Sequence, residues 1–151
     1  MIHTPESDGP FPGVVFVHGA VDRDTWSPLE QYVDEQRRLA MAGYVVLVPD
    51  LRNHGESDDD PNYFTDLEMG TSADVVNAAR ALAALPDVDP DRTAVVGYSF
   101  GGVITFNTMV VAPDVAEAFV AAAPGSLSAW ENFSRFIPAD SPPYEAMTDL
   151  R

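Results

Sequence analysis

Cysteine and lysine are both absent from the 151-residue sequence. Without cysteine, the chain can form no disulfide, no thiol nucleophile and no cysteine-ligated metal site. Without lysine, the 8 basic residues are all arginines; they stand against 24 acidic residues, and the formal net charge is −16. Such a charge repels the phosphates of nucleic acids and anionic membrane surfaces. We therefore expect neither nucleic acid nor a membrane as a partner.

Long apolar runs are missing as well. The longest, around residues 103–111, is about half as long as a bilayer span requires. Residues 1–6 contain neither a basic cluster nor an apolar run, so they do not form a secretory signal. We expect a soluble, cytoplasmic protein. Its acidity has two open interpretations, a well-solvated surface or adaptation to a salt-rich cytoplasm.

Short β-branched runs alternate with longer amphipathic segments along the chain. The runs predict apolar strands at residues 13–17, 44–48 and 93–96, and a fourth, weaker strand at 118–123. Helices are expected from a capping box at Ser27–Glu30 to about Gly43, from Thr71 to about residue 85, and over residues 102–111. In the tail, helical spacing continues weakly at Leu127, Trp130, Phe133 and Ile137.

This alternation, with its short connections, predicts the α/β class and a single domain over residues 1–151. The expected architecture is a three-layer α/β/α sandwich around a mainly parallel sheet of about four core strands. Ligands of such sheets bind at the carboxyl ends of the strands. His18, Asp50 and Ser99 closely follow three of the predicted strands, so we expect them at one common edge.

The segment Gly97-Tyr98-Ser99-Phe100-Gly101 lies between a predicted strand and a predicted helix. A Gly-x-Ser-x-Gly pattern is weak alone, but this context is typical of a turn that exposes a nucleophilic serine at a helix N-terminus. Glycine is required at 97 and 101 because side chains there would collide at the reversal from strand to helix. An ordinary glycine-rich turn capped by serine is the alternative.

Three blocks, in this order and at this spacing, resemble the α/β-hydrolase superfamily, in particular its dienelactone-hydrolase-like and prolyl-oligopeptidase-like branch. They are Phe16–Gly19, Val48–Ser57, and Val88–Arg92 leading into Gly97–Gly102. The resemblance implies that Ser99 attacks a carbonyl carbon and forms an acyl-enzyme. It also implies an oxyanion hole made by the backbone N–H groups of Phe100 and Ala20, with Val21 as the alternative to Ala20. His18 would shape the oxyanion loop.

A histidine after Ser99 is missing too, although the family order is serine, acid, histidine. His3, His18 and His54 all precede Ser99. We expect His3 in a frayed terminus, and His54 in a loop that has a structural role in the superfamily. Asp140 is an alternative acid, whereas Asp114 and Asp149 are expected to be solvated.

The segment Ser141–Tyr144 resembles the one that precedes the next core strand in these families. We therefore expect a C-terminally truncated or partial chain, the nucleophile half of the domain, which lacks the catalytic acid and histidine. Such a chain would be inactive alone. It would also be marginally stable, or would self-associate through an exposed sheet edge.

The expected function is a serine hydrolase of ester, lactone or peptide-like acyl bonds in small-molecule or peptide substrates, without a cofactor. A catalytically inactive binding or interaction domain is the alternative. A nucleotide-binding domain is disfavoured because His18–Asp22 contains no glycine-rich phosphate loop. No metal site is expected, since Glu56 and Asp58–Asp60 lack the spacing of a calcium loop. Core packing and an acyl pocket stay open for four aromatic residues: Trp26, Trp130, Phe133 and Phe136.

Overall fold

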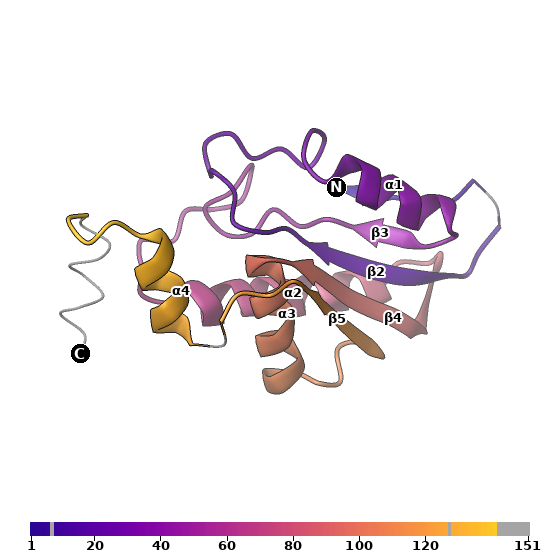
Figure 1. The fold of residues 1–151 in the computed structure, drawn as a ribbon. Coiled ribbons are helices and arrows are strands. Elements are labelled where there is room, and N and C mark those ends of the chain that lie inside the picture. Colours follow the sequence, from indigo (N-terminus) through magenta and orange to yellow (C-terminus); the bar gives the residue numbers. More distant parts are fainter. Residues whose placement is uncertain (7, 127, 142–151) are drawn as a thin grey trace.

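A computed structural model describes residues 1–6, 8–126 and 128–141 of the chain. In chain order its elements are β1 (Ile2–His3), β2 (Phe11–Val17), α1 (Val33–Met41), β3 (Val45–Leu47), α2 (Leu67–Ala83), β4 (Val88–Tyr98), α3 (Phe100–Val111), β5 (Ala118–Ala122) and α4 (Ala129–Phe136) (Figure 1). The strands form one sheet in the order β1-β3-β2-β4-β5. Strands β3, β2, β4 and β5 are parallel, while β1 runs antiparallel to β3.

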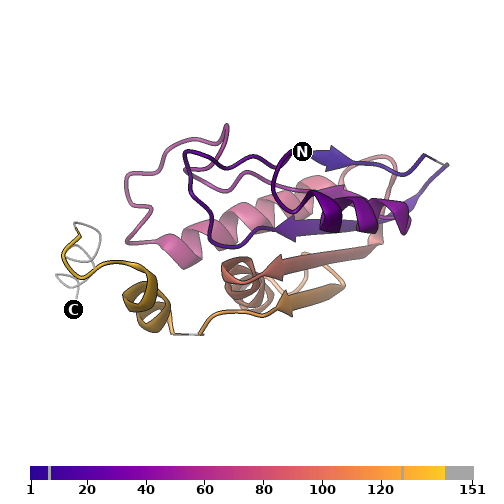
Figure 2. The ribbon, with the colours of Figure 1, turned by 45° about the horizontal axis from the view of Figure 1, so that its top comes forward.

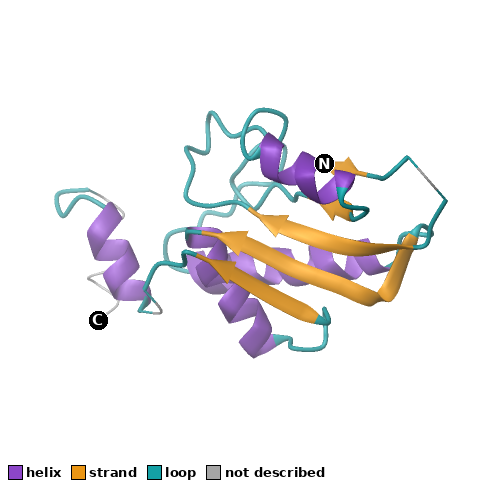
Figure 3. Ribbon diagram, turned by 45° about the vertical axis from the view of Figure 1, so that its right-hand side comes forward, coloured by secondary structure: helices purple, strands orange, loops and turns teal. Residues whose placement is uncertain are grey.

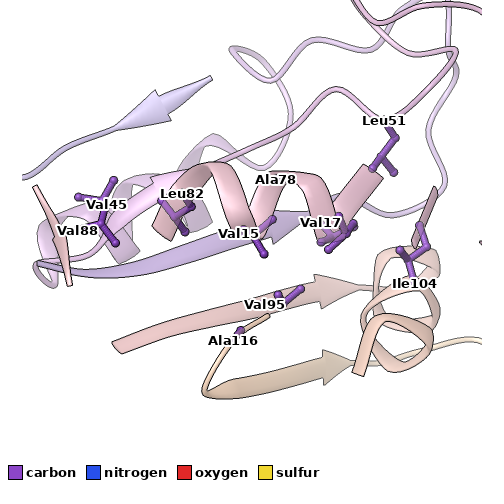
Figure 4. Close-up of a cluster of buried hydrophobic side chains, with 12 residues drawn as sticks. Val15, Val17, Val45, Leu51, Ala78, Leu82, Val88, Val95, Ile104 and Ala116 are labelled. Atoms are coloured by element: carbon purple, nitrogen blue, oxygen red, sulfur yellow. The ribbon is translucent and has the colours of Figure 1, made fainter. Parts of the chain in front are cut away.

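Helices cover both faces of this sheet (Figures 2 and 3). On one face, α2 and α3 pack over a cluster centred on β2 and β4, to which Val15 and Val17 belong (Figure 4). On the other face, α1 packs over a cluster that contains Phe16 and Val46. Neighbouring residues of β2 enter opposite clusters because successive side chains of a strand alternate between its faces. The predicted α/β/α sandwich with a mainly parallel sheet is confirmed.

All four predicted strands are present, with shifted ends. Strand β2 begins at Phe11, and β4 begins at Val88, which pairs with Phe11 across a register shift before Gly13. The prediction missed this amino-terminal part of β4 because Pro90 and three charged residues interrupt its apolar pattern.

The expected fraying of His3 is wrong. Residues Ile2 and His3 form β1, which pairs with Leu47 and Val46 of β3. The Met1 ammonium donates to the Val48 carbonyl at 2.8 Å, and His3 Nε2 lies 3.0 Å from the Gln36 side-chain oxygen. A strand of two residues is too short to leave a periodic pattern, so only its pairing with β3 reveals it.

The three predicted helices are present, but each begins at another residue, and α3 begins at Phe100 rather than at residue 102. Helix α2 begins at Leu67, before the predicted start at Thr71. Helix α1 begins at Val33, well after the predicted capping box. The Ser27 carbonyl instead accepts hydrogen bonds from the N–H groups of residues 30 and 31, which forms an isolated turn. None of the helices in the described ranges is long and apolar enough to span a bilayer.

Strand β5 lies at one edge of the described sheet, where it pairs only with β4 (Figure 3). Its Val120 side chain is 49% exposed. Because such an edge offers unpaired backbone groups to another strand, we predict that the 151-residue chain self-associates through β5. Val120→Lys should weaken this association, since a charge on an edge strand disfavours pairing.

Sedimentation velocity at increasing protein concentration measures the effect. Ile2→Lys is the control, because Ile2 is 48% exposed on β1 at the opposite edge of the sheet. A wild-type chain that stays monomeric at every concentration would contradict the prediction, and so would equal effects of the two lysine variants.

Candidate active site

Ser99 alone connects β4, which ends at Tyr98, to α3, which begins at Phe100. Its backbone has φ 56° and ψ −118°, outside the regions that residues with a β-carbon prefer. The Ser99 N–H donates to the Ala122 carbonyl at 3.0 Å, and the Ser99 carbonyl accepts from the Gly102 N–H at 3.0 Å. The end of β5 and the first turn of α3 therefore hold this strained residue in place.

The Ser99 hydroxyl makes no capping hydrogen bond to α3, although Ser99 occupies the N-cap position. Serine is favoured at that position when its side chain satisfies a free N–H of the first turn. The alternative of an ordinary serine-capped turn is therefore not what the structure shows. Across the described ranges, the Ser99 hydroxyl forms no hydrogen bond with another residue.

Glycine is required on both sides of Ser99. A β-carbon on Gly97 would overlap the Gly101 carbonyl and the Thr105 hydroxyl. A β-carbon on Gly101 would overlap the carbonyl oxygen of Val17, at the end of β2. These contacts are the collisions predicted from the sequence for side chains at positions 97 and 101.

The loop after β2 lies directly against the Ser99 turn. A β-carbon placed on Gly19 would lie 3.2 Å from Ser99 Cβ and 3.2 Å from the Tyr98 carbonyl oxygen. Ala20 follows Gly19, and Phe100 opens α3, where the first N–H groups have no partner within the helix. Across the described ranges, neither the Ala20 nor the Phe100 N–H donates to another protein group. Both amides are available beside Ser99.

His18 is buried behind this loop, with 1% of its surface exposed. Its Nδ1 atom lies 2.8 Å from the Gly19 carbonyl oxygen, to which Nδ1–H donates. Its ring packs against Trp26, with centroids 4.1 Å apart, and lies 4.9 Å from the ring of His54. Burial lowers the His18 pKa to about 4, so the ring is neutral at pH 7. These contacts support a structural role of His18 in the loop after β2.

The loop after β3 is tied to the loop after β2 through Asp50. The Trp26 indole N–H donates to the Asp50 carboxylate at 2.7 Å, and the Ser57 hydroxyl donates to the Asp50 carbonyl at 2.7 Å. His54 is buried in the same loop and donates through Nδ1–H to the Arg52 carbonyl at 3.0 Å. Burial lowers the pKa of His54 as well. His54 thus stabilises the loop.

In the acidic part of that loop, Glu56, Asp58 and Asp59 are exposed, whereas Asp60 is partly buried. Arg52 pairs with Asp60 at 2.7 Å and donates from two of its nitrogens to the Asp74 carboxylate, at 3.0 and 2.9 Å. Hydrogen bonds and charge from Asp74 raise the pKa of Arg52 further above its usual value. Within the described ranges, no three acidic or histidine side chains are arranged to hold a metal ion.

A hollow of about 360 Å³ opens beside the carboxyl end of β4, on the face that α1 covers. Its lining includes Phe16, Tyr32, Val96 and Tyr98. Trp26 is not in this lining, because it packs in the core beneath α1, where it is 5% exposed. Of the other aromatic candidates, Trp130 is half-buried, and the side chains of Phe133 and Phe136 lie outside the described part of the structure.

The structure brings no histidine to the Ser99 hydroxyl among the described residues. His3 lies on β1, which β3 and β2 separate from β4.

The alternative acid Asp140 is exposed, and so is Asp114, which was expected to be solvated. The remaining sequence predictions, at Leu127, Pro142–Tyr144 and Asp149, fall outside the described residues. The structure also places the Tyr32 hydroxyl next to Gly19, and no sequence motif marks this tyrosine.

A sequence model of the alpha/beta hydrolase family matches residues 14–150. The chain belongs to the alpha/beta hydrolase family. This confirms the resemblance that the sequence motifs indicate. Esterase EstD of Thermotoga maritima (strain ATCC 43589 / DSM 3109 / JCM 10099 / NBRC 100826 / MSB8) is 33% identical over 119 residues, which make up 77% of this chain and 26% of the esterase.

Solved structures of this family share the fold. Acetyl xylan esterase 1 from Thermoanaerobacterium sp. JW/SL YS485 superimposes with a TM-score of 0.67 at 23% identity, over 97% of this chain and 49% of that one. A Klebsiella pneumoniae subsp. pneumoniae MGH 78578 protein assigned as a dienelactone hydrolase gives 0.54 at 29% identity, over 74% and 48%. This alpha/beta hydrolase chain thus spans about a quarter of EstD and about half of each structure.

The steric contact at Gly101 generates a prediction. Gly101→Ala should lower the free energy of unfolding by about 3 kcal/mol, because the new methyl group overlaps a backbone carbonyl that cannot rotate away. Gly102→Ala is the matched control. Its methyl group would lie 3.2 Å from Pro124, a contact that a small shift relieves, so the loss should stay below about 1 kcal/mol. Urea unfolding measures both variants. Equal losses of stability would contradict the view that the contact with the Val17 carbonyl requires glycine at position 101.

The burial of His18 predicts a pH dependence of stability. Because its pKa falls from 6.5 to about 4 on folding, the unfolded chain binds more protons between these pH values. The free energy of unfolding should therefore decrease as the pH falls from 6.5 toward 4, by on the order of 3 kcal/mol from this histidine.

Urea unfolding of the wild type and of His18→Asn over this pH range isolates the effect. Asparagine keeps an N–H donor near the Nδ1 position but does not titrate, and both proteins retain His54 and the carboxylates. The wild type should lose more stability than the variant as the pH falls. Parallel pH profiles of the two proteins would disprove the prediction.

Proposed function

We propose that the protein is a serine hydrolase that cleaves ester, lactone or peptide-like acyl bonds, with Ser99 as the nucleophile. The observation that supports this most directly is the conformation of Ser99. Its backbone is strained at φ 56°, its hydroxyl does not cap α3, and its Cβ lies next to the Gly19 loop. Strain of this kind is retained where it serves a site. Membership of a family that includes esterases supports the same reaction class.

In the proposed reaction, the Ser99 hydroxyl oxygen attacks the carbonyl carbon of the substrate and loses its proton to a base. The backbone N–H groups of Phe100 and Ala20 donate hydrogen bonds to the negative oxygen of the tetrahedral intermediate. The intermediate expels the alcohol or amine, which takes up the proton, and leaves an acyl-enzyme. Water then attacks the acyl-enzyme and releases the acid. Gly97 and Gly101 serve this chemistry by allowing the turn to form.

We propose that the histidine base and its acid are supplied by a C-terminal part beyond these 151 residues, so that this chain alone is inactive. No histidine follows Ser99 in the sequence, whereas the family order places one there. The similar proteins are also much longer than this chain. A small-molecule or peptide substrate and a cytoplasmic location stay predictions.

A second candidate is a binding or interaction domain that keeps the fold without catalysis. The observation in its favour is that no histidine among the described residues hydrogen-bonds to Ser99. The two candidates differ in the reactivity of the Ser99 hydroxyl. Only a hydrolase activates this hydroxyl toward a phosphonylating reagent.

A fluorophosphonate probe therefore tests the proposal on the protein product of the full reading frame that contains this chain. We expect labelling at Ser99, located by peptide mass spectrometry, together with hydrolysis of p-nitrophenyl acetate. Ser99→Ala should abolish labelling and lower kcat by about 10⁴-fold or more. The exposed Ser128→Ala variant is the control and should behave as the wild type. A folded product that the probe leaves unlabelled would favour the binding domain.

A further inference from the structure

Tyr32, just before α1, has an unusual backbone for a residue with a side chain, with φ 57° and ψ 23°. In the described part of the chain, four non-glycine residues have positive φ: Tyr32, Asn53, Ser99 and Ala123. Each lies in the segment that follows one of the parallel strands β2, β3, β4 and β5. Ligands of such sheets bind at the carboxyl ends of the strands, where these segments begin. Backbone strain concentrates at functional sites.

The Tyr32 hydroxyl lies beside the Ser99 turn. A β-carbon built on Gly19 would be 2.8 Å from Tyr32 Oη and 3.2 Å from Ser99 Cβ. Because these two distances share one end point, Tyr32 Oη and Ser99 Cβ are no more than about 6 Å apart. The carbonyl oxygen of an acyl group bonded to Ser99 Oγ can reach the space between them. That space borders Gly19, which directly precedes the proposed donor Ala20.

The hydroxyl is free to donate, and its ring is held in place. Throughout the described ranges, no protein group forms a hydrogen bond with Tyr32 Oη. The ring packs against Phe16 and Tyr98, with centroid distances of 5.6 and 6.1 Å. The Tyr32 carbonyl accepts the N–H of Gln36 at 3.1 Å, which fixes the backbone at the start of α1. A donor positioned in advance needs little reorganisation when charge develops nearby.

We propose that Tyr32 is a further catalytic residue, whose hydroxyl donates a hydrogen bond to the substrate carbonyl oxygen as this oxygen becomes negative. It adds an O–H donor to the backbone N–H groups of Ala20 and Phe100, and it keeps its proton throughout. This inference rests on the proposed function, since it requires that Ser99 form the tetrahedral intermediate. The proposed role also explains why residue 19 is glycine, because any side chain there would fill the space between Tyr32 and Ser99.

Tyr32→Phe tests the inference, because it removes the hydroxyl and keeps the ring. The matched control is Tyr44→Phe. Tyr44 directly precedes β3, and its ring, like that of Tyr32, packs against the cluster that contains Phe16 and Val46, so this variant also removes a hydroxyl and keeps the ring. Both variants are made in the full reading-frame product used for the Ser99 experiment. The measurements are kcat and KM with p-nitrophenyl acetate, inhibition by a boronic acid that mimics the tetrahedral intermediate, and Tm.

We expect Tyr32→Phe to lower kcat by about 10- to 100-fold and to weaken the boronic acid by a similar factor. KM and Tm should stay near the wild-type values, and Tyr44→Phe should behave as the wild type. A loss of kcat below about fivefold would overturn the proposal. A matching loss in Tyr44→Phe, or a loss explained by a lower Tm, would also overturn it, because the hydroxyl would then act through packing.

The Ser99→Ala variant separates this outcome from a failure of the proposed function. If Ser99→Ala is inactive and Tyr32→Phe is fully active, only the assignment of Tyr32 fails. If Ser99→Ala retains full activity, the hydrolase mechanism through Ser99 fails, and the role of Tyr32 fails with it.

Discussion

The close approach of three chain segments around Ser99 is the constraint on which the rest of the site depends. Strand β4 can turn directly into α3 only because Gly97 and Gly101 leave room for the backbone of the first helical turn and of β2. The same contact brings the end of β2 against the turn, so Gly19 and Ala20 lie beside Ser99. One steric arrangement thus presents the Ser99 hydroxyl and the free N–H groups together.

The loops around this turn are held by buried polar contacts and by the partly exposed ion pairs of Arg52. The Trp26 indole and the Asp50 carboxylate join the loop after β2 to the loop after β3, and the rings of His18 and His54 pack between them. Burial keeps both histidines neutral at pH 7, which leaves them suited to stabilising loops. Two acidic residues also hold the loop after β3, since Asp60 and Asp74 both pair with Arg52.

Among the described residues, the non-glycine residues with positive φ all lie in segments that follow the parallel strands. Tyr32 and Ser99 approach each other across Gly19, and each has a conformation that a glycine would adopt at lower cost. Retaining a tyrosine and a serine at these positions is understandable if Ser99 attacks the carbonyl carbon of a substrate and Tyr32 donates to its carbonyl oxygen. Beside them, the hollow lined by Phe16 and Val96 offers apolar surface next to the turn.

The sequence by itself determined the class of fold, the order of the parallel strands along the chain and the Ser99 turn. Buried strands appear as continuous apolar runs, and the turn requires glycine at fixed positions. Only the tertiary structure decided the start of α1, the pairing of β1 with β3 and the place of the Tyr32 hydroxyl. A capping pattern at Ser27 fits a local turn as well as a helix, and two residues have no periodicity. Tyr32 and Ser99 meet through packing between distant segments, which leaves no local pattern in the sequence.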